Sequence, residues 1–220
     1  DMLPGKIEHV HRIWEWRTES ILPFIFKFLY NKDKHNNSHY TDAIFIDFAK
    51  AFDRVQHKRS MTKICNLQLD DKTTQWISSF LTNRVQSVKL NAISTPRPVK
   101  SGVPQGSVLG PLLFLVYIND IGSNINSSLC LFVDDCIIYK EITEPNDVNI
   151  LQSDLTKLSE WCHLWQMEIN VNKTKHVRLP SVAHPSPHEY VINNLVIQTV
   201  PSIKYLGILF HFDITWTSYV

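Results

Sequence analysis

Leu129–Tyr139 reads LCLFVDDCIIY, two apolar runs on either side of an acidic pair. The runs are Leu129–Val133 and Cys136–Tyr139, and Asp134-Asp135 joins them. Short apolar runs that are bounded by turn-forming residues are typical of buried strands. The sequence therefore predicts a β-hairpin that carries two carboxylates at its tip.

A second apolar run, Ala43–Ile46, is bounded by Asp42 and Asp47 and predicts another buried strand. The clearest helix follows Pro145, where large apolar residues recur at spacings of 4, 3, 4 and 3: Leu151, Leu155, Leu158, Cys162 and Trp165. Another helix is expected over residues 71–82, because Asp70 and Asp71 precede apolar residues at helical spacing. These apolar stripes are most simply core-facing.

The remaining signals complete a mixed pattern. Pro111 at the start of an apolar run predicts a helix with proline at its first position. Asn193-Asn194, between two short apolar runs, predicts a second hairpin. Three further strands are expected at Val85–Leu90, His176–Leu179 and Ile203–Phe210. Hairpins with helices grouped between them indicate the α+β class, with an antiparallel sheet backed by helices.

Composition limits the kind of function. The chain has 220 residues, of which 44% are hydrophobic and 20% charged, so it can bury a core. Lys and Arg number 22 against 21 Asp and Glu, which gives a formal charge of +1. This balance excludes a histone-like basic tail or an acidic tail as the main feature. Any contact with nucleic acid must therefore use a local site.

The cysteines and the hydropathy pattern indicate an intracellular protein, nuclear or cytoplasmic, in a reducing compartment. The four cysteines form no CxxC pair and have no zinc-finger spacing to histidine, so we expect reduced thiols. The longest apolar stretch, Val108–Ile118, is broken by Gly110 and Pro111 and is shorter than the roughly 20 residues of a membrane span. No signal peptide is recognisable, and no membrane partner is expected.

Asp47, Asp134 and Asp135 are the candidate catalytic residues. Each lies at the end of a predicted buried strand, and carboxylates that converge there raise each other's pKa unless cations lie between them. Mg²⁺ prefers hard oxygen ligands and takes one or two carboxylates together with substrate phosphate oxygens. Two such ions can hold the attacking and leaving oxygens of a phosphoryl displacement.

Each of these features also has a structural interpretation. Asp47 alone could cap a strand end, and Asp134-Asp135 could be ordinary turn residues. Ser101–Ser107 reads SGVPQGS, a constrained turn that permits close backbone approach by a ligand. By itself, however, it could be a surface loop before a core helix.

Three motifs in order resemble motifs A, B and C of reverse transcriptases encoded by non-LTR (LINE-like, jockey/CR1-like) retrotransposons. They are Ile44–Asp53 (IFIDFAKAFD), Ser101–Pro111 (SGVPQGSVLGP) and Leu131–Asp135 (LFVDD). Flanking segments such as Trp76–Val88 and Ile203–Leu209 are also similar, so the resemblance covers roughly residues 40–216. It implies a polymerase palm-type sheet with partial fingers.

The resemblance implies a role for each matched residue. Asp47, the backbone carbonyl of Phe48 and Asp134 match the ligands of two Mg²⁺ ions, for which Mn²⁺ can substitute, and Asp135 is their acidic neighbour. Phe52 matches the bulky position beneath the incoming sugar, where a ring favours deoxynucleotides. Further matched positions are the nucleotide-binding Gln105 and Gly106, the possible proton donor Lys173 of motif D, and the motif E primer grip at Tyr205, Leu206 and Gly207.

The implied function is RNA-directed DNA polymerisation with an RNA template, a DNA primer and dNTPs as partners. Residues 42–220 match the palm domain with motifs A to E, and residues 1–41 resemble an eroded finger-like segment. A thumb and an endonuclease domain are expected to be absent from this chain. Val133 stands where this element family usually has alanine, which is a mild departure.

Three alternatives remain open. The chain could be a catalytically inactive remnant of such a domain, which retains the fold and binds nucleic acid or a partner. It could be another palm phosphotransferase, such as an RNA-dependent RNA polymerase or a nucleotidyl cyclase, although Phe52 argues against the use of ribonucleotides. A two-carboxylate glycosidase is the weakest alternative, because no carboxyl group is isolated in an apolar pocket as a general acid.

Overall fold

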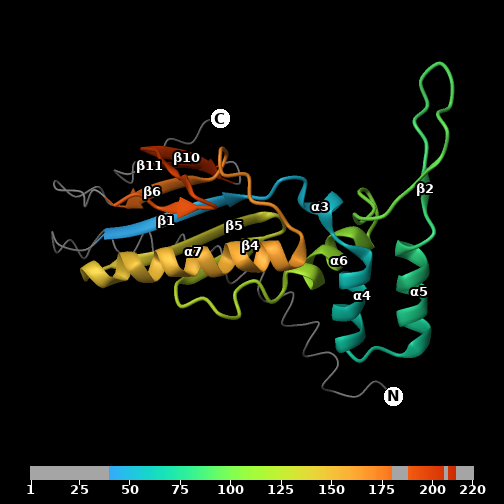
Figure 1. Ribbon diagram of the computed structural model, residues 1–220, viewed down its shortest axis with the longest axis horizontal. Coiled ribbons are helices and arrows are strands. Elements are labelled where there is room, and N and C mark those ends of the chain that lie inside the picture. Colours follow the sequence, from blue (N-terminus) through green and yellow to red (C-terminus); the bar gives the residue numbers. More distant parts are fainter. Residues whose placement is uncertain (1–39, 180–187, 206–207, 212–220) are drawn as a thin grey trace.

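The computed structural model describes residues 40–179, 188–205 and 208–211. Almost all of the finger-like segment 1–41, together with Leu206 and Gly207 of the expected primer grip, therefore lies outside the described residues. The described chain forms a sheet layered between a long helix and a hairpin, with shorter helices at one end (Figure 1).

Within the described residues, the central sheet has five strands in the order β4-β5-β1-β6-β9. All neighbouring pairs are antiparallel except β6 and β9, which are parallel. The apolar run predicted around Ala43–Ile46 lies in the middle of the sheet and is buried on both faces. In sheet order the strands span Ser128–Phe132, Asp135–Ile142, Tyr40–Asp47, Lys175–Leu179 and Gln198–Thr199.

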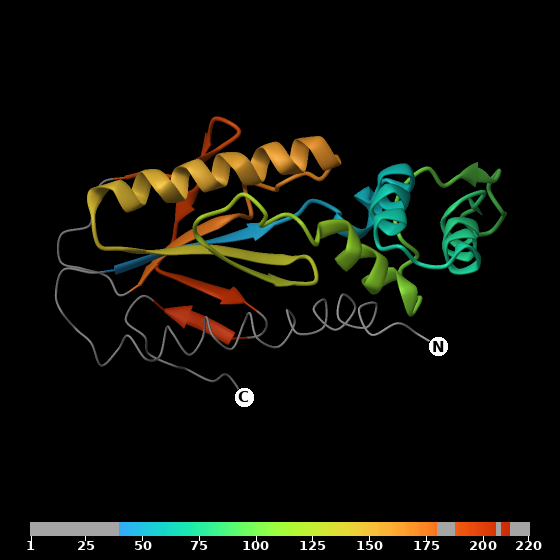
Figure 2. The ribbon, with the colours of Figure 1, turned by 90° about the horizontal axis from the view of Figure 1, so that it is seen from below.

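Helix α7 (Pro145–Trp165) covers one face of this sheet (Figure 2). Its apolar stripe, including Leu151, Leu155 and Leu158, is fully buried against the sheet residues Ile44 and Ile138. The helical spacing in the sequence thus correctly predicted which face of α7 is buried.

The other face of the sheet carries a smaller core. Ala43 and Phe45, which alternate with Ile44 along β1, pack there beneath the hairpin of β10 (Ser202–Tyr205) and β11 (Ile208–His211). The Tyr205 ring meets the Phe45 ring edge-on, with centroids 5.3 Å apart. Because successive side chains of a strand point to opposite faces, β1 contributes to both cores.

Shorter helices lie beyond the end of β1 that carries Asp47 (Figure 1). A hairpin of β2 and β3 extends from α5 away from the sheet. Strands β7 and β8 form another hairpin. Its turn residues, Asn193 and Asn194, both have positive φ, as expected for a type I′ turn. The bounds are α3 Ala51–Arg54, α4 His57–Asn66, α5 Asp71–Leu81, α6 Leu109–Ile118, β2 Val85–Gln86, β3 Arg97–Pro98, β7 Val191–Ile192 and β8 Leu195–Val196.

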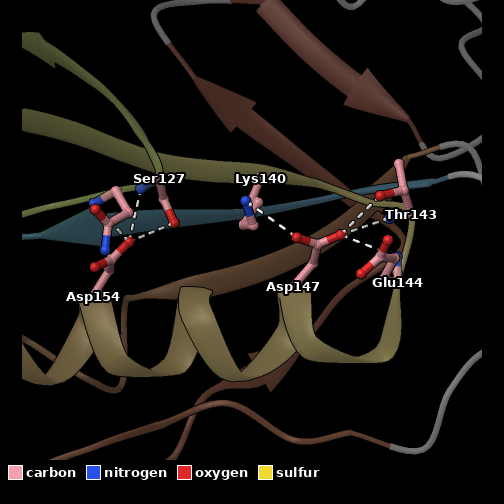
Figure 3. Close-up of polar contacts among 7 residues, drawn as sticks. Ser127, Lys140, Thr143, Glu144, Asp147 and Asp154 are labelled. Carbon is pink, nitrogen blue, oxygen red and sulfur yellow. Dashed lines mark hydrogen bonds and ion pairs between the residues drawn. The ribbon is translucent and has the colours of Figure 1, made fainter.

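Two aspartates fix α7 to the sheet (Figure 3). Asp147 forms a capping box with Glu144, and its Oδ2 accepts hydrogen bonds from both the backbone N–H and the hydroxyl of Thr143 at 3.0 Å. About two turns further on, the buried Asp154 accepts hydrogen bonds from the N–H and hydroxyl groups of Ser127, just before β4. The helix is therefore bonded both to the residue that precedes β4 and to the residue that follows β5.

The structure corrects several predicted boundaries. The expected strand over Val85–Leu90 is only the two-residue β2, whose Val85 and Gln86 pair with Pro98 and Arg97 of β3. Helix α6 begins at Leu109, so Pro111 is its third residue instead of its first. The single strand expected over Ile203–Phe210 is the β10–β11 hairpin, in which Tyr205 pairs with Ile208.

The α+β class and the mainly antiparallel sheet are confirmed. The described cysteines are free, with Cys130, Cys136 and Cys162 buried and Cys65 exposed. No helix in the described ranges combines the length and the apolarity that a membrane crossing requires.

Candidate active site

The strand register brings the predicted aspartates together. Asp47, the last residue of β1, is directly opposite Asp135, the first residue of β5. Directly opposed residues of an antiparallel pair lie on the same face with Cβ atoms roughly 5 Å apart. Asp47 lies on the same face of β1 as Ala43 and Phe45, opposite the face that α7 covers.

The hairpin tip differs from the expected one. Phe132 pairs with Asp135, so the turn residues are Val133 and Asp134, and Asp135 belongs to β5. Val133 has a φ of 57°, a left-handed conformation that is rare for a β-branched residue and costs on the order of 1–2 kcal/mol. The strained residue is directly adjacent to the exposed Asp134.

The carboxylates affect one another electrostatically. Burial raises the pKa of Asp135, and the negative charges of Asp134 and Asp47 raise it further. Repulsion among these three groups was the expected consequence of convergence, and a bound cation would relieve it.

The site has hard oxygen donors of the type that Mg²⁺ prefers. Asp47 is 41% exposed at its side chain, and Asp134 is exposed. In the described ranges, however, no three His, Cys, Asp or Glu side chains are grouped closely enough to hold a metal ion. The donors therefore fit an open site, in which one or two carboxylates share the ion with water and substrate oxygens.

A loop from the far end of α7 closes on Asp47. The N–H of Asn170 donates to the Asp47 carbonyl at 2.8 Å, and the Asp47 N–H donates to the Thr174 hydroxyl at 3.4 Å. Phe48 continues the contact through a single bridge to Ile169. This arrangement places Lys173 Nζ 3.9 Å from Asp47 Oδ2, although both side chains are exposed enough for water to weaken the pair.

The SGVPQGS loop packs against the segment that follows Asp47. The N–H groups of Gly102 and Val103 donate to the carbonyls of Val55 and Phe52 at 2.8 and 3.0 Å. Gly102 has a φ of 92°, and a Cβ there would lie 3.1 Å from the Asp53 Cα. Glycine is therefore required both by conformation and by close approach. The buried His57 also contacts the Gly102 carbonyl, at 2.8 Å.

At the tip of this loop, Gln105 and Gly106 are exposed. Gln105 Nε2 lies 3.5 Å from Asp53 Oδ1, which is a long hydrogen bond. Gly106 has a φ of 80°, and a Cβ at this position would meet nothing within 4 Å. Gly106 is consequently a position where a ligand can approach the backbone.

Phe52 and Tyr205 belong to different cores, Phe52 at the edge of the larger one and Tyr205 in the smaller one. The Phe52 ring, half-buried, stacks on Phe114 of α6 with centroids 4.6 Å apart. Tyr205 is buried, and burial together with the charge of Asp135 raises its pKa. The Tyr205 hydroxyl is thus within electrostatic reach of Asp135, while its ring packs in the smaller core.

Two supporting residues were not identified from the sequence. Asp154 is a fully buried carboxylate on the apolar face of α7, and its position three residues after Leu151 was the available signal. For Lys63 of α4 the sequence contains no comparable signal. Its Nζ lies 3.6 Å from the centroid of Trp165 and 2.5 Å from Asp120 Oδ1, which ties α4 to the helices beside the sheet.

Comparison with known sequences gives consistent matches. Residues 6–210 match the family model described as reverse transcriptase (RNA-dependent DNA polymerase). The chain is 32% identical over 199 residues to the probable RNA-directed DNA polymerase from transposon X-element of Drosophila melanogaster, covering 84% of this chain and 21% of that protein. It is 30% identical over 213 residues to the transposon BS protein of the same species, covering 92% and 22%.

A third relative is the RNA-directed DNA polymerase from mobile element jockey of Drosophila funebris, 27% identical over 228 residues, with 98% and 23% coverage. The chain thus spans about a fifth of the length of these curated relatives. Among solved structures, apo telomerase from Candida tropicalis truncated from the C-terminal domain aligns with a TM-score of 0.62 at 14% identity, covering 92% of this chain and 40% of that one. Telomerase from Candida albicans with a fragment of telomeric RNA gives 0.63 at 15% identity, with 97% and 36% coverage.

Proposed function

Since the chain belongs to the reverse transcriptase (RNA-dependent DNA polymerase) family, we propose that its residues 42–220 form the palm of an RNA-directed DNA polymerase. The single observation that carries this proposal is the register that sets Asp47 opposite Asp135 beside the Val133-Asp134 turn. Motifs A and C of a polymerase would have to meet at this position. The proposed substrates are an RNA template, a DNA primer and dNTPs.

Reverse transcriptases generally use divalent metal ions. For this chain we assign the Asp47 and Asp134 carboxylates and the Phe48 carbonyl as ligands of two Mg²⁺ ions, with Mn²⁺ as a substitute. When bound, these ions would neutralise the charge that develops on the attacking and leaving oxygens of the phosphoryl transfer. Burial raises the pKa of Asp135 most, and the charges of Asp134 and Asp47 add to it; that repulsion supports the assignment, because a cation between the carboxylates would remove it.

The other residues act by positioning and by proton transfer. Phe52, held by its stack on Phe114, lies where its ring would exclude a ribose 2′-hydroxyl. Gln105 and Gly106 present the loop tip to the incoming nucleotide and the template base. Lys173 is held beside Asp47 and donates a proton to the pyrophosphate leaving group. Tyr205, Leu206 and Gly207 are the residues that we assign to hold the primer end.

The test is extension of a recessed DNA primer on an RNA template by this 220-residue chain with dNTPs and Mg²⁺. We expect extension by the unaltered chain, none with a chelator, and recovery on adding Mg²⁺ or Mn²⁺. Asp134→Asn should lower the extension rate by about 100-fold or more, since it removes charge stabilisation at the reacting phosphate. Glu141→Gln, an exposed change on the same β5 strand, is the matched control and should extend normally.

Two outcomes would contradict the proposal. If Asp134→Asn kept the folded chain's full activity, the metal assignment would be wrong. If the folded chain extended no primer at any metal concentration, it would be an inactive remnant of the family. The proposal also includes a reducing intracellular compartment, which the free, largely buried thiols support.

A further inference from the structure

The peptide group between Gly102 and Val103 is hydrogen-bonded on both of its sides. Its carbonyl oxygen lies 2.8 Å from Nε2 of His57, the first residue of α4. Its N–H donates to the Phe52 carbonyl at 3.0 Å. Because a carbonyl oxygen can only accept, Nε2 of His57 carries the hydrogen and donates it. One peptide plane of the SGVPQGS loop is thus fixed between a side chain of α4 and the segment that follows Asp47.

Glycine at position 102 leaves this peptide plane otherwise free to turn. Gly102 has a φ of 92°, and a residue without a Cβ meets little steric resistance to rotation of its backbone. Rotation of the plane would break both hydrogen bonds at once, so each bond supports the other. The Gly102 N–H belongs to the preceding peptide group and donates to the Val55 carbonyl at 2.8 Å. The His57 contact therefore restricts the orientation of the plane, while the Val55 contact keeps the loop docked.

The requirements of α4 do not explain a buried histidine at its first position. The first turn of this helix has no acidic residue, and His57 is followed by Lys58 and Arg59. A further cationic residue is unfavourable there, because the N-terminal end of a helix carries a partial positive charge. His57 is nonetheless only 8% exposed. Since buried polar groups are normally hydrogen-bonded, the contact with the loop accounts for the place of this side chain.

The loop is anchored at its other end as well. The Ser107 hydroxyl donates to the Pro104 carbonyl at 2.6 Å and accepts from the Gly110 N–H of α6 at 3.0 Å. A Cβ at Gly110 would lie 2.5 Å from the Pro104 carbonyl oxygen, so the loop and α6 are in close contact there. Between the two anchors lie Gln105 and Gly106, which are exposed. The orientation of this short tip therefore depends on both anchors.

We propose that His57 is a positioning residue for the incoming nucleotide, which acts through the hydrogen bond that it donates to the Gly102 carbonyl. It fixes the peptide plane from which the tip at Gln105 and Gly106 extends, and which also bonds the Phe52 carbonyl. The inference rests on the proposed function, because the incoming nucleotide is assigned to this tip. Without the donor the loop is looser before the nucleotide arrives, so that nucleotide binding has to order it.

Two substitutions separate the donor from the shape of the ring. His57→Leu retains an apolar side chain but has no polar atom, whereas His57→Gln places an amide N–H near the position of Nε2. Ile64→Val is the matched control, since it removes one carbon from a buried residue about two turns along the same helix and lowers stability there. Thermal unfolding confirms that each chain is folded, and the measurements are made well below the lowest Tm.

The first measurement needs no polymerase activity. Hydrogen exchange of single backbone N–H groups, followed by NMR, should show the Val103 N–H exchanging about tenfold faster in His57→Leu, as expected for the loss of one hydrogen bond. In His57→Gln and in Ile64→Val it should exchange at nearly the unaltered rate. The Asn170 N–H, which donates to the Asp47 carbonyl in another part of the site, is the internal reference and should not change.

The second measurement is incorporation of a single nucleotide. His57→Leu should raise the KM for a dNTP about tenfold and leave kcat nearly unchanged, because the residue supports nucleotide binding and does not contact the reacting atoms. His57→Gln should return the KM to near that of the unaltered chain, and Ile64→Val should not alter it. A purely structural role would instead lower kcat by reducing the amount of folded enzyme.

Three results would overturn the inference. One is an unchanged exchange rate of the Val103 N–H in His57→Leu. Another is a His57→Gln chain that behaves like His57→Leu, which would attribute the effect to the shape of the ring. The third is faster exchange with an unchanged KM, which would show that the loop anchor does not position the nucleotide. Failure of the proposed function is distinguishable, because in a chain that extends no primer the exchange rates still decide whether His57 holds the loop.

Discussion

Phe52 shows how one side chain can have a structural and a selective role. Its ring stacks on Phe114 with an interplanar angle of 22°, which restricts the direction in which the ring can turn. Its backbone carbonyl also accepts the hydrogen bond from Val103 that holds the SGVPQGS loop. The side chain beneath the proposed sugar position is thus fixed by a helix and a loop from distant parts of the sequence.

We predict that Phe52→Val increases ribonucleotide use. The smaller side chain leaves room for a 2′-hydroxyl, so the ratio of kcat/KM for a dNTP to that for the matching rNTP should fall by about 100-fold. Single-nucleotide incorporation measures both constants. Phe52→Tyr, which keeps an aromatic ring at this position, is the control and should leave the ratio close to that of the unaltered chain. A ratio that does not change would favour the alternative of another palm phosphotransferase.

At the scale of elements, α7 is a helix whose polar caps matter as much as its apolar stripe. The carboxylates of Asp147 and Asp154 bind the segments that precede α7 and β4 (Figure 3). Lys140 of β5 adds an ion pair to Asp147 at 3.2 Å. The stripe fixes which face is buried, and the caps fix where the helix lies along the β4–β5 hairpin whose tip carries Asp134.

We predict that Asp147→Ala lowers the free energy of unfolding by about 1–2 kcal/mol at pH 7, the usual effect of losing a helix cap. Hydrogen bonds, first among them the one from the Thr143 N–H, lower the pKa of Asp147 from 3.8 to about 2. A carboxyl whose pKa is lower in the folded state stabilises it above the unfolded pKa and loses that effect as the pH falls.

The difference between Asp147→Ala and the unaltered chain should therefore be fully present above about pH 4 and shrink as the pH approaches 2. Urea denaturation at several pH values measures it. Glu160→Ala, an exposed change in the same helix, should alter stability by less than about 0.5 kcal/mol at any of them. A pH-independent difference would show that the carboxylate does not act as a charged cap.

At the scale of the whole molecule, a buried polar network joins three separate segments. Asp42 of β1 is fully buried and contacts Arg178 Nε at 2.8 Å, His176 Nε2 at 3.0 Å and the Tyr190 hydroxyl at 2.8 Å. Burial would raise the pKa of Asp42, but hydrogen bonds and charges from His176 and Arg178 outweigh it and the pKa is lowered. The network fixes β6 and the segment before β7 against β1.

We predict that Asp42→Asn destabilises the chain by about 3–5 kcal/mol, because it keeps the shape but removes the charge that the Arg178 guanidinium faces in the interior. Chemical denaturation at pH 7 measures the change. Asp71→Asn, at an exposed position, should stay within about 0.5 kcal/mol. A loss below about 1 kcal/mol for Asp42→Asn would mean that water reaches the network.

The sequence by itself determined the local structure and the identity of the chemical groups. Helical spacing predicted α7, the Asn193-Asn194 pair predicted its hairpin, and the motif order predicted the family that the comparisons confirm. Where the sequence was wrong, at the hairpin tip and at the strand expected over Ile203–Phe210, the error was one of pairing. Apolar runs mark strands, but they do not specify which residues are opposite one another.

Only the tertiary structure decided how residues far apart in the sequence meet. Asp47 and Asp135 are 88 positions apart, and their opposition follows from a register that the buried faces of β1 and β5 impose together. The approach of Lys173 to Asp47 and the packing of the Gly102 loop on Phe52 likewise depend on backbone hydrogen bonds between distant segments. Such contacts arise from the burial of whole surfaces, which no local pattern in the sequence contains.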